Sequence, residues 1–101
     1  MEKALIEKFF SYLRRGDGYL KEKRLEAAYN SYMDGLYTFG AYLVYLDTGL
    51  LLPQRELTGF LKSRHPEVYE LILRFSGLSQ FKEETVKALG DELRWLGDVV
   101  I

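Results

Sequence analysis

The chain has 101 residues, which is enough for one hydrophobic core and too few for a second one. Apolar residues make up 48% of it and charged residues 29%, so its composition is that of a folded domain and excludes a disordered or collagen-like chain. It has no cysteine, which excludes disulfides and thiolate chemistry, and its single histidine excludes most zinc and di-iron sites. Its formal net charge of −1 excludes the dense basic face of a dedicated nucleic-acid-binding domain. We therefore expect no metal and no other cofactor.

The first segment, residues 2–22, predicts an amphipathic helix with apolar residues at spacings of three and four. The pattern is interrupted by Gly16, Asp17 and Gly18. Because a glycine costs up to about 1 kcal/mol in a helix interior, we expect the helix to bend there or to break into two pieces. Charged residues at positions 2, 3, 7 and 8 leave no apolar targeting segment, so we expect a cytoplasmic protein.

The charge of this first segment differs from that of the rest. Residues 1–24 have seven Lys or Arg against four acids, whereas residues 25–101 have seven against eleven. Such a split favours contact between the N-terminal quarter and a polyanion or an acidic partner, and the alternative is a solvated helix surface. The candidate basic patch is made up of Arg14, Arg15, Lys21, Lys23 and Arg24.

Residues 25–47 predict a long central helix. Seven apolar residues fall on one face at alternating spacings of four and three, namely Leu25, Tyr29, Tyr32, Leu36, Phe39, Leu43 and Leu46. A second apolar line beside it widens the apolar arc, and no Lys or Arg occurs between residues 25 and 54. A membrane span would explain this run, but its glycines, tyrosines and Asp47 favour a helix that is covered by protein on most sides. Gly49 is expected to end the helix in a left-handed conformation.

Three shorter helices are predicted to follow, at residues 54–63, 66–76 and 80–98. Pro53 and Pro66 are placed for the starts of the first two, and Ser79 is placed to cap the third. No strand-like alternation occurs, and we expect short connections between antiparallel neighbours. The sequence therefore predicts a single all-α domain over residues 1–101, like a four-helix bundle but with five helical segments.

Two groups of polar residues are candidates for a functional site. Asn30, Asp34 and Thr38 lie four residues apart on the polar face of the central helix. An exposed face explains this polar patch, and the alternative is pairing of Asp34 across a dimer interface or with Arg14 or Arg15. The only histidine, His65, lies beside Arg64. It could act as a general acid or base while Arg64 holds an anion, and the alternative is that it is simply a residue at a helix boundary.

Aromatic residues make up 15% of the chain, and the tyrosines concentrate where Lys and Arg are absent. This distribution favours packing in a core or an interface over stacking on nucleic-acid bases. Gly90 and Gly97, seven apart on the last predicted helix, would admit another helix closely, either from the same chain or across a dimer seam.

Two resemblances bear on the fold. The segment from Leu25 to Leu36, followed by Gly49 to Pro53, resembles the central part of HEPN-type helical domains. This resemblance implies a small, often dimeric bundle that accompanies a minimal nucleotidyltransferase or acts as a ribonuclease. Nuclease members have an Arg four to six residues before a His, whereas Arg55 here is ten positions before His65, so no catalytic role is carried over. The spacing of Tyr32, Gly35, Leu36 and Gly40 is also similar to a small uncharacterised archaeal helical family.

The sequence thus leads to three hypotheses of function. The first is a non-enzymatic bundle that acts by protein–protein association, as a homodimer, through aromatic surface of the central helix and the Gly90–Gly97 stripe. The second is an accessory RNA- or nucleotide-binding domain that uses the basic patch. The third is a ribonuclease centred on Arg64 and His65. No membrane partner is expected.

Overall fold

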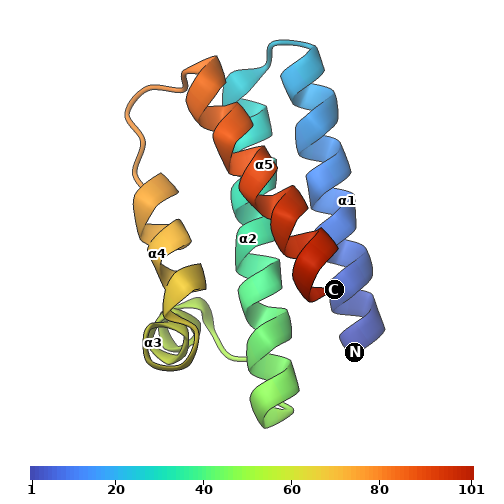
Figure 1. Cartoon of the computed structure of the whole chain (residues 1–101), viewed down its shortest axis with the longest axis vertical. Coiled ribbons are helices and arrows are strands. Elements are labelled where there is room, and N and C mark those ends of the chain that lie inside the picture. Colours follow the sequence, from blue (N-terminus) through green and yellow to red (C-terminus); the bar gives the residue numbers. More distant parts are fainter.

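Five α-helices carry most of the chain in the computed structural model, which describes residues 1–101. They are α1 (Glu2–Lys21), α2 (Leu25–Thr48), α3 (Gln54–Arg64), α4 (Pro66–Phe75) and α5 (Glu83–Val100). Four of them run roughly along the long dimension of the molecule, while α3 crosses them and is seen end-on in Figure 1. The all-α, bundle-like architecture with five segments is therefore confirmed.

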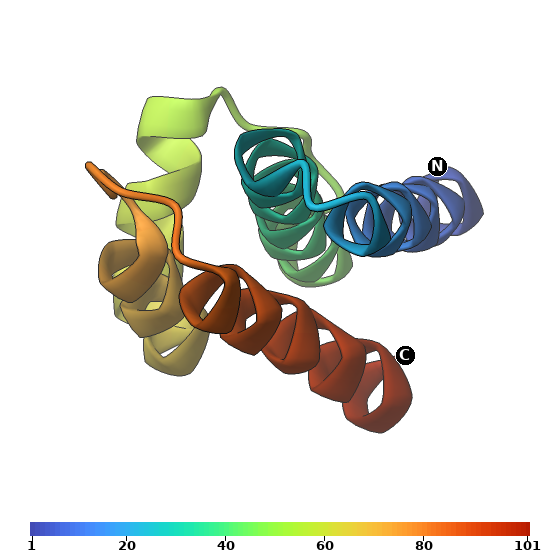
Figure 2. The same ribbon diagram turned by 90° about the horizontal axis from the view of Figure 1, so that it is seen from above.

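The helices pack in two groups that share α2. The helices α1 and α2 form an antiparallel hairpin that packs along its length, and α5 lies against both of them (Figure 2). The helices α3 and α4 pack on each other and on another side of α2. None of the five helices combines the length and the apolar character that crossing a membrane requires.

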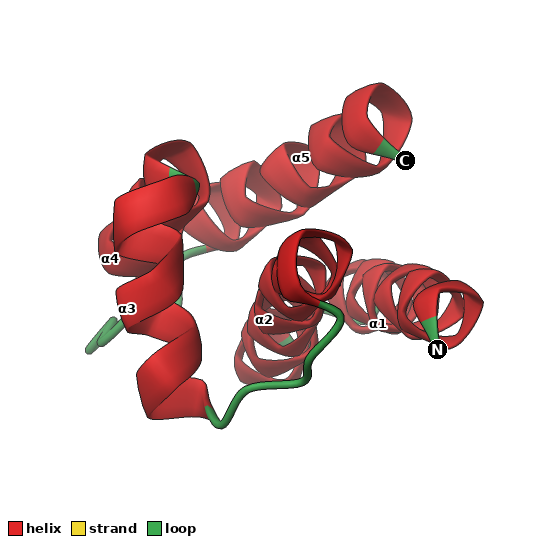
Figure 3. Cartoon of the chain, turned by 90° about the horizontal axis from the view of Figure 1, so that it is seen from below, coloured by secondary structure: helices red, strands yellow, loops and turns green.

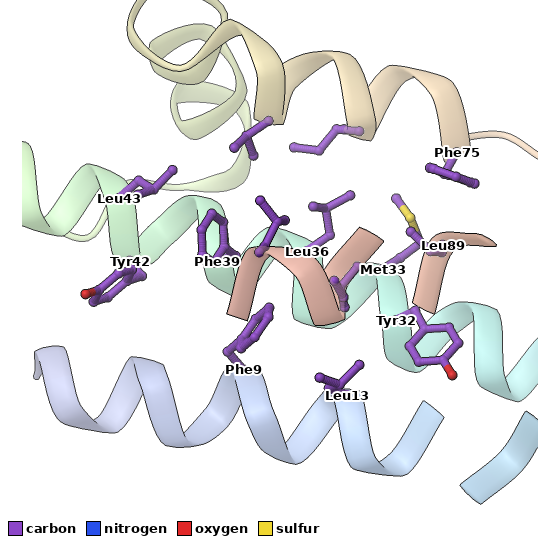
Figure 4. Close-up of a cluster of buried hydrophobic side chains, with 14 of the residues drawn as sticks. Phe9, Leu13, Tyr32, Met33, Leu36, Phe39, Tyr42, Leu43, Phe75 and Leu89 are labelled. Carbon is purple, nitrogen blue, oxygen red and sulfur yellow. The ribbon is translucent and has the colours of Figure 1, made fainter. Parts of the chain in front are cut away.

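The central helix α2 is buried on most sides, as its wide apolar arc predicts. Figure 4 shows Leu36 and Phe39 of α2 inside a cluster to which the other helices contribute, among them Phe9 of α1 and Leu89 of α5. The prediction for Leu46 is wrong, since half of its surface is exposed. Leu46 lies near the C-terminal end of α2, and this end projects beyond the other helices (Figure 1).

The expected bend or break at Gly16, Asp17 and Gly18 is also wrong, because α1 is continuous through all three. The reason is the ring of Tyr32, which packs directly on the backbone of Gly16. A Cβ at Gly16 would lie 2.4 Å from two atoms of this ring, so only glycine permits the contact. Burial of the large Tyr32 side chain offsets the cost of glycine in the helix.

The hydroxyl of Tyr32 connects three helices. It donates a hydrogen bond of 2.6 Å to Oδ1 of Asp17, and Nη1 of Arg94 donates to Oδ2 of the same carboxylate at 2.9 Å. Burial of the phenol, together with the negative charge of Asp17, raises the pKa of Tyr32 above its usual range. This network fastens α1, α2 and α5 at one end of the molecule.

The helix boundaries mostly follow the predicted signals. Gly49 takes the left-handed conformation with φ of 74°, and Pro66 occupies the first turn of α4. The last helix is the exception, because it begins at Glu83 and not at residue 80, and Ser79 does not cap it. Phe81 packs on Tyr29 with ring centroids 5.1 Å apart, so residues 76–82 form a loop that apolar contact holds in place.

The stripe of Gly90 and Gly97 is used within the chain. A Cβ at Gly90 would lie 2.7 Å from Tyr32, and a Cβ at Gly97 would lie 3.0 Å from Phe10. The two glycines therefore let α5 approach α1 and α2 closely, which is the first of the two alternatives that the sequence leaves open.

Candidate functional site

The helix α5 diverges from α4 along its length, as Figures 2 and 3 show from opposite sides. A hollow lies between these two helices and α2. It has a volume of about 270 Å³, and six of its eight lining residues are hydrophobic. The lining consists of Phe39 and Leu43 from α2, His65, Glu67 and Val68 from the start of α4, and Trp95, Leu96 and Val100 from α5. We call this the Trp95 groove. Its floor is the central helix, and its walls are two helices that scarcely touch each other.

The position of Trp95 on α5 explains why the groove is open. The inward face of α5 is formed by Leu93 and Leu96, which are buried against the core. Trp95 lies one residue before Leu96, so it points about 100° away from the inward face. More than half of its side chain, 56%, is exposed, and Val99 and Val100 beyond it are exposed as well. A run of large exposed apolar residues beside an apolar hollow is typical of an interaction surface.

A polar contact fixes one edge of this groove. Nε2 of His65 lies 2.7 Å from Oδ2 of Asp47, and both side chains are about three-quarters buried. The contact ties the junction between α3 and α4 to the last turn of α2. Sequence reasoning missed Asp47 as the partner of His65, although Asp47 is the only charged residue between Gly35 and Leu52. An isolated charge in an apolar helix was the available signal.

The two residues of the ribonuclease hypothesis, Arg64 and His65, have different partners in the fold. The guanidinium of Arg64 lies over the ring of Phe60, 5.9 Å from its centroid, whereas His65 is bonded to Asp47. The guanidinium and the imidazole are therefore each engaged with a different partner. No group of three or more His, Asp or Glu side chains lies in position to hold a metal ion.

The rim of the groove is acidic. Glu67 lines it on the α4 side, and Asp91 and Glu92 flank Trp95 in a second, shallow depression on the α5 side. Asp98 is exposed one turn beyond Trp95, on the same side of α5. Carboxylates therefore surround an apolar centre.

Two cations near this rim are engaged in ion pairs, and a third, Arg64 beside His65, lies over the ring of Phe60. Nη2 of Arg74 lies 3.8 Å from Oε1 of Glu92, which joins α4 to α5. Arg94 is paired with Asp17 at 2.9 Å and with Asp91 at 3.4 Å. The unpaired carboxylates of Glu67 and Asp98 leave the rim with a negative charge.

The predicted basic patch is divided by the fold. Nζ of Lys23 forms an ion pair with Glu83 at the start of α5. The guanidinium of Arg24 stacks on the ring of Tyr19 at 4.7 Å and lies 3.7 Å from a carboxylate oxygen of Glu22. These two cations hold the turn between α1 and α2 in place and are less available to a ligand.

Three of the five predicted cations remain without an ion pair, and all three are exposed on α1. They are Arg14, Arg15 and Lys21. Arg15 lies 5.2 Å from the ring centroid of Tyr12, and Lys8 lies 5.9 Å from the same centroid. Lys8 and Tyr12 are additions that the sequence reasoning missed, and their signal was the spacing of four and three that places residues 8, 12 and 15 on one stripe.

Only two of the three residues of the predicted polar patch are exposed at the surface. Asn30 and Asp34 are exposed, and Asp34 forms no ion pair with Arg14 or Arg15, which agrees with the exposed-face interpretation. Thr38 lies one turn after Asp34, but it is buried and so does not contribute to the exposed patch. Its hydroxyl donates a hydrogen bond of 2.7 Å to the backbone carbonyl of Asp34, which satisfies the polar group inside the helix and permits its burial.

Comparison with protein-family models, curated proteins and solved structures finds no match to this chain. The resemblance to HEPN-type domains and to the small archaeal family therefore stays a prediction, as does the cytoplasmic location. The fold and the groove define the class in structural terms: a five-helix bundle with one open apolar groove.

Proposed function

We propose that the protein acts by protein–protein association and not by catalysis, and that its contact surface is the Trp95 groove. The observation that carries this proposal is the exposed Trp95 side chain beside an apolar hollow on the same face. A projection and a hollow within one patch are self-complementary. A twofold dimer can then place the Trp95 of each copy against the hollow of the other.

This surface replaces the two that the sequence favoured for a homodimer. The aromatic face of α2 is largely covered by the other helices, with Tyr32 and Tyr42 both buried. The Gly90–Gly97 stripe is occupied by Tyr32, Phe9 and Phe10 of the same chain. The homodimer itself remains our proposal, now through the Trp95 groove.

The expected dimer is weak. An aromatic side chain buries roughly 150–250 Å² when fully covered, so two half-exposed tryptophans contribute on the order of 200 Å². At about 25 cal/mol per Å² this supplies about 5 kcal/mol, to be set against an association cost of at least about 4 kcal/mol. The hollow that each tryptophan covers loses a similar apolar area, which brings the gain to about 8–10 kcal/mol and the net to about 4–6 kcal/mol, so we expect a dissociation constant of about 10 µM to 1 mM.

Sedimentation equilibrium of the full chain over that concentration range tests the proposal. Wild type should form a concentration-dependent dimer, and Trp95→Ala should stay monomeric. Leu73→Ala is the matched control, because Leu73 is as exposed as Trp95 but lies on α4 outside the groove. A strict monomer at the highest concentration, or a Trp95→Ala variant that dimerises like wild type, would contradict self-association through this surface.

The salt dependence of the dimer gives a second readout. A twofold contact brings the acidic rim of one copy near the acidic rim of the other. Salt screens this repulsion within a Debye length of about 8 Å at physiological ionic strength. The dimer should therefore become tighter as the salt concentration rises.

A second candidate function is binding of single-stranded RNA along α1. The observation that favours it is the placement of Lys8 and Arg15 around Tyr12, with Arg14 and Lys21 unpaired nearby. Three or four phosphate contacts would give a slope of log affinity against log salt of about −2 to −3. This sign is opposite to that expected for the dimer.

Fluorescence anisotropy with a labelled oligonucleotide tests this candidate. The triple variant Arg14→Gln, Arg15→Gln and Lys21→Gln should lose binding. Lys87→Gln, which removes an exposed cation from α5, should retain it. Absence of binding by wild type at low salt would rule the candidate out.

A further inference from the structure

The Trp95 groove and the surface that a second copy brings to it have the same negative charge, so a second copy does not complement the charge of the groove. Its centre is apolar and Glu67 lines it on the α4 side. On the α5 side, Asp91 and Glu92 lie beside Trp95 and Asp98 is exposed one turn beyond it, so the surroundings of the groove are acidic. We propose that the groove binds a basic amphipathic helix of another protein, whose apolar side chains enter the hollow and whose Lys or Arg side chains meet this rim. The inference rests on the proposed function only in using the same groove.

The shape of the groove fits the apolar anchors of a helix. Its volume of about 270 Å³ is just below the roughly 300–1,000 Å³ of typical small-molecule pockets. It therefore holds anchoring side chains and not a whole ligand or helix. Amphipathic helices present such anchors at spacings of three and four, and a groove between two helices is a common way to receive them.

Charge complementarity selects a basic partner. Arg74 and Arg94, two cations near Trp95, are already paired with Glu92, Asp17 and Asp91. The other two carboxylates, Glu67 and Asp98, form no ion pair within the chain, so a Lys or Arg that approaches the rim can pair with them. A neutral or acidic helix would gain the same apolar contacts without this attraction.

The chain does not supply such a helix from a second copy. Its basic amphipathic helices are α1 and α3, and the apolar face of each is buried in the bundle, with Phe9 of α1 and Leu61 of α3 fully covered. Offering either face to another molecule would require the bundle to come apart. A second copy can bring only its own acidic rim and Trp95, so the basic helix must come from a different protein.

Fluorescence of Trp95 gives a direct assay, because it is the only tryptophan in the chain. The probes are three synthetic helical peptides of about 18 residues, which span about 27 Å. They share one leucine face, contain no tryptophan, and have lysine, glutamine or glutamate on both flanks. We expect the lysine peptide to shift the emission to the blue with saturation, and to bind at least about tenfold more tightly than the glutamate peptide. Its affinity should fall as salt rises.

Charge reversal distinguishes the rim from the net charge of the protein. The double variant Glu67→Lys and Asp98→Lys should lose at least about tenfold in affinity for the lysine peptide and gain affinity for the glutamate peptide. The control is Glu26→Lys with Glu56→Lys, which changes the net charge equally at exposed positions away from the groove. It should bind the lysine peptide nearly as wild type does. Both variants replace exposed side chains, and far-ultraviolet circular dichroism checks that they remain folded.

The outcomes separate this inference from self-association. Binding of the lysine peptide by a chain that stays monomeric supports the basic-helix partner and contradicts the homodimer. A dimer that tightens with salt, together with equal affinity for all three peptides, supports self-association and overturns the inference. Equal loss of affinity in the rim variant and the control variant also overturns it, since net charge would then explain the preference. No fluorescence change with any peptide overturns it as well.

Discussion

Two glycines in α1 should respond in opposite directions to the same substitution. Gly16 is buried against the ring of Tyr32, whereas Gly18, two residues later, is exposed, and a Cβ added there would have nothing within 4 Å. Alanine is the better helix former at both positions. We expect Gly18→Ala to stabilise the protein and Gly16→Ala to destabilise it.

The magnitudes follow from what each methyl group meets. At Gly16 it would lie 2.4 Å from Cδ1 and Cε1 of Tyr32 and 2.9 Å from Cζ. The ring has no room to retreat, because the backbone of Gly90 packs near its Cζ and its hydroxyl is bonded to Asp17. Overpacking costs about 1–3 kcal/mol and loss of the hydrogen bond adds about 1 kcal/mol, against a propensity gain of about 1 kcal/mol. The net loss for Gly16→Ala is about 1–3 kcal/mol, while Gly18→Ala gains up to about 1 kcal/mol.

Thermal and denaturant unfolding followed by circular dichroism measure this difference. A single domain of this length is expected to unfold in two states. A gap of about 2 kcal/mol or more between the variants corresponds to at least about 8 °C in Tm. If Gly16→Ala is as stable as Gly18→Ala, Tyr32 does not pack on α1 as described, and the explanation for the unbroken helix fails.

Two further predictions concern Tyr32 and His65. The pKa of Tyr32 is raised in the folded state, so above about pH 10 the unfolded phenol loses its proton first and stability should fall by up to about 1.4 kcal/mol per pH unit. Tyr32→Phe should be about 1–2 kcal/mol less stable at pH 8, and its stability should not show this fall above about pH 10. Urea titrations at several pH values measure both effects. If the stability of the variant falls with pH as that of wild type does, the phenol is not buried as described. For His65, we expect wild type and His65→Ala to leave a labelled RNA equally intact in a cleavage assay, and cleavage that depends on His65 would revive the ribonuclease hypothesis.

The sequence was sufficient for the helices because their signals are local. The spacing of apolar residues predicts all five segments, and Gly49 and Pro66 mark boundaries that the structure reproduces. The failures lie where distant residues override a local signal. Gly16 and Gly18 indicate a break locally, but Tyr32 from the next helix packs on Gly16 and stabilises the continuous helix. Ser79 indicates a helix cap locally, but Phe81 packs on Tyr29 and keeps the segment around Ser79 in a loop.

The candidate site was predictable only in part for the same reason. The acidic character of the later segments and the absence of cysteine are visible in the composition, but the groove needs the divergence of α5 from α4, which no local pattern encodes. Trp95 did carry a usable signal, since a large apolar residue that falls off the inward stripe of an amphipathic helix is exposed unless another element covers it. Asp47 carried one too, as the only charge in its stretch, but its partner His65 comes from a different helix junction.

The division of charge along the chain acquires a spatial meaning in the folded molecule. The unpaired cations Arg14, Arg15 and Lys21 lie on α1, whereas Glu67 lines the open groove and Asp98 is exposed one turn beyond Trp95. A basic helix would be repelled by the outer face of α1 and attracted to the groove. The charges of these two surfaces would therefore affect both the affinity of the helix and its orientation on the protein. An acidic partner or an RNA would be steered the opposite way, toward α1. The two surfaces therefore respond differently to the charge of the ligand, and the lysine and glutamate peptides discriminate between them even before a natural partner is identified.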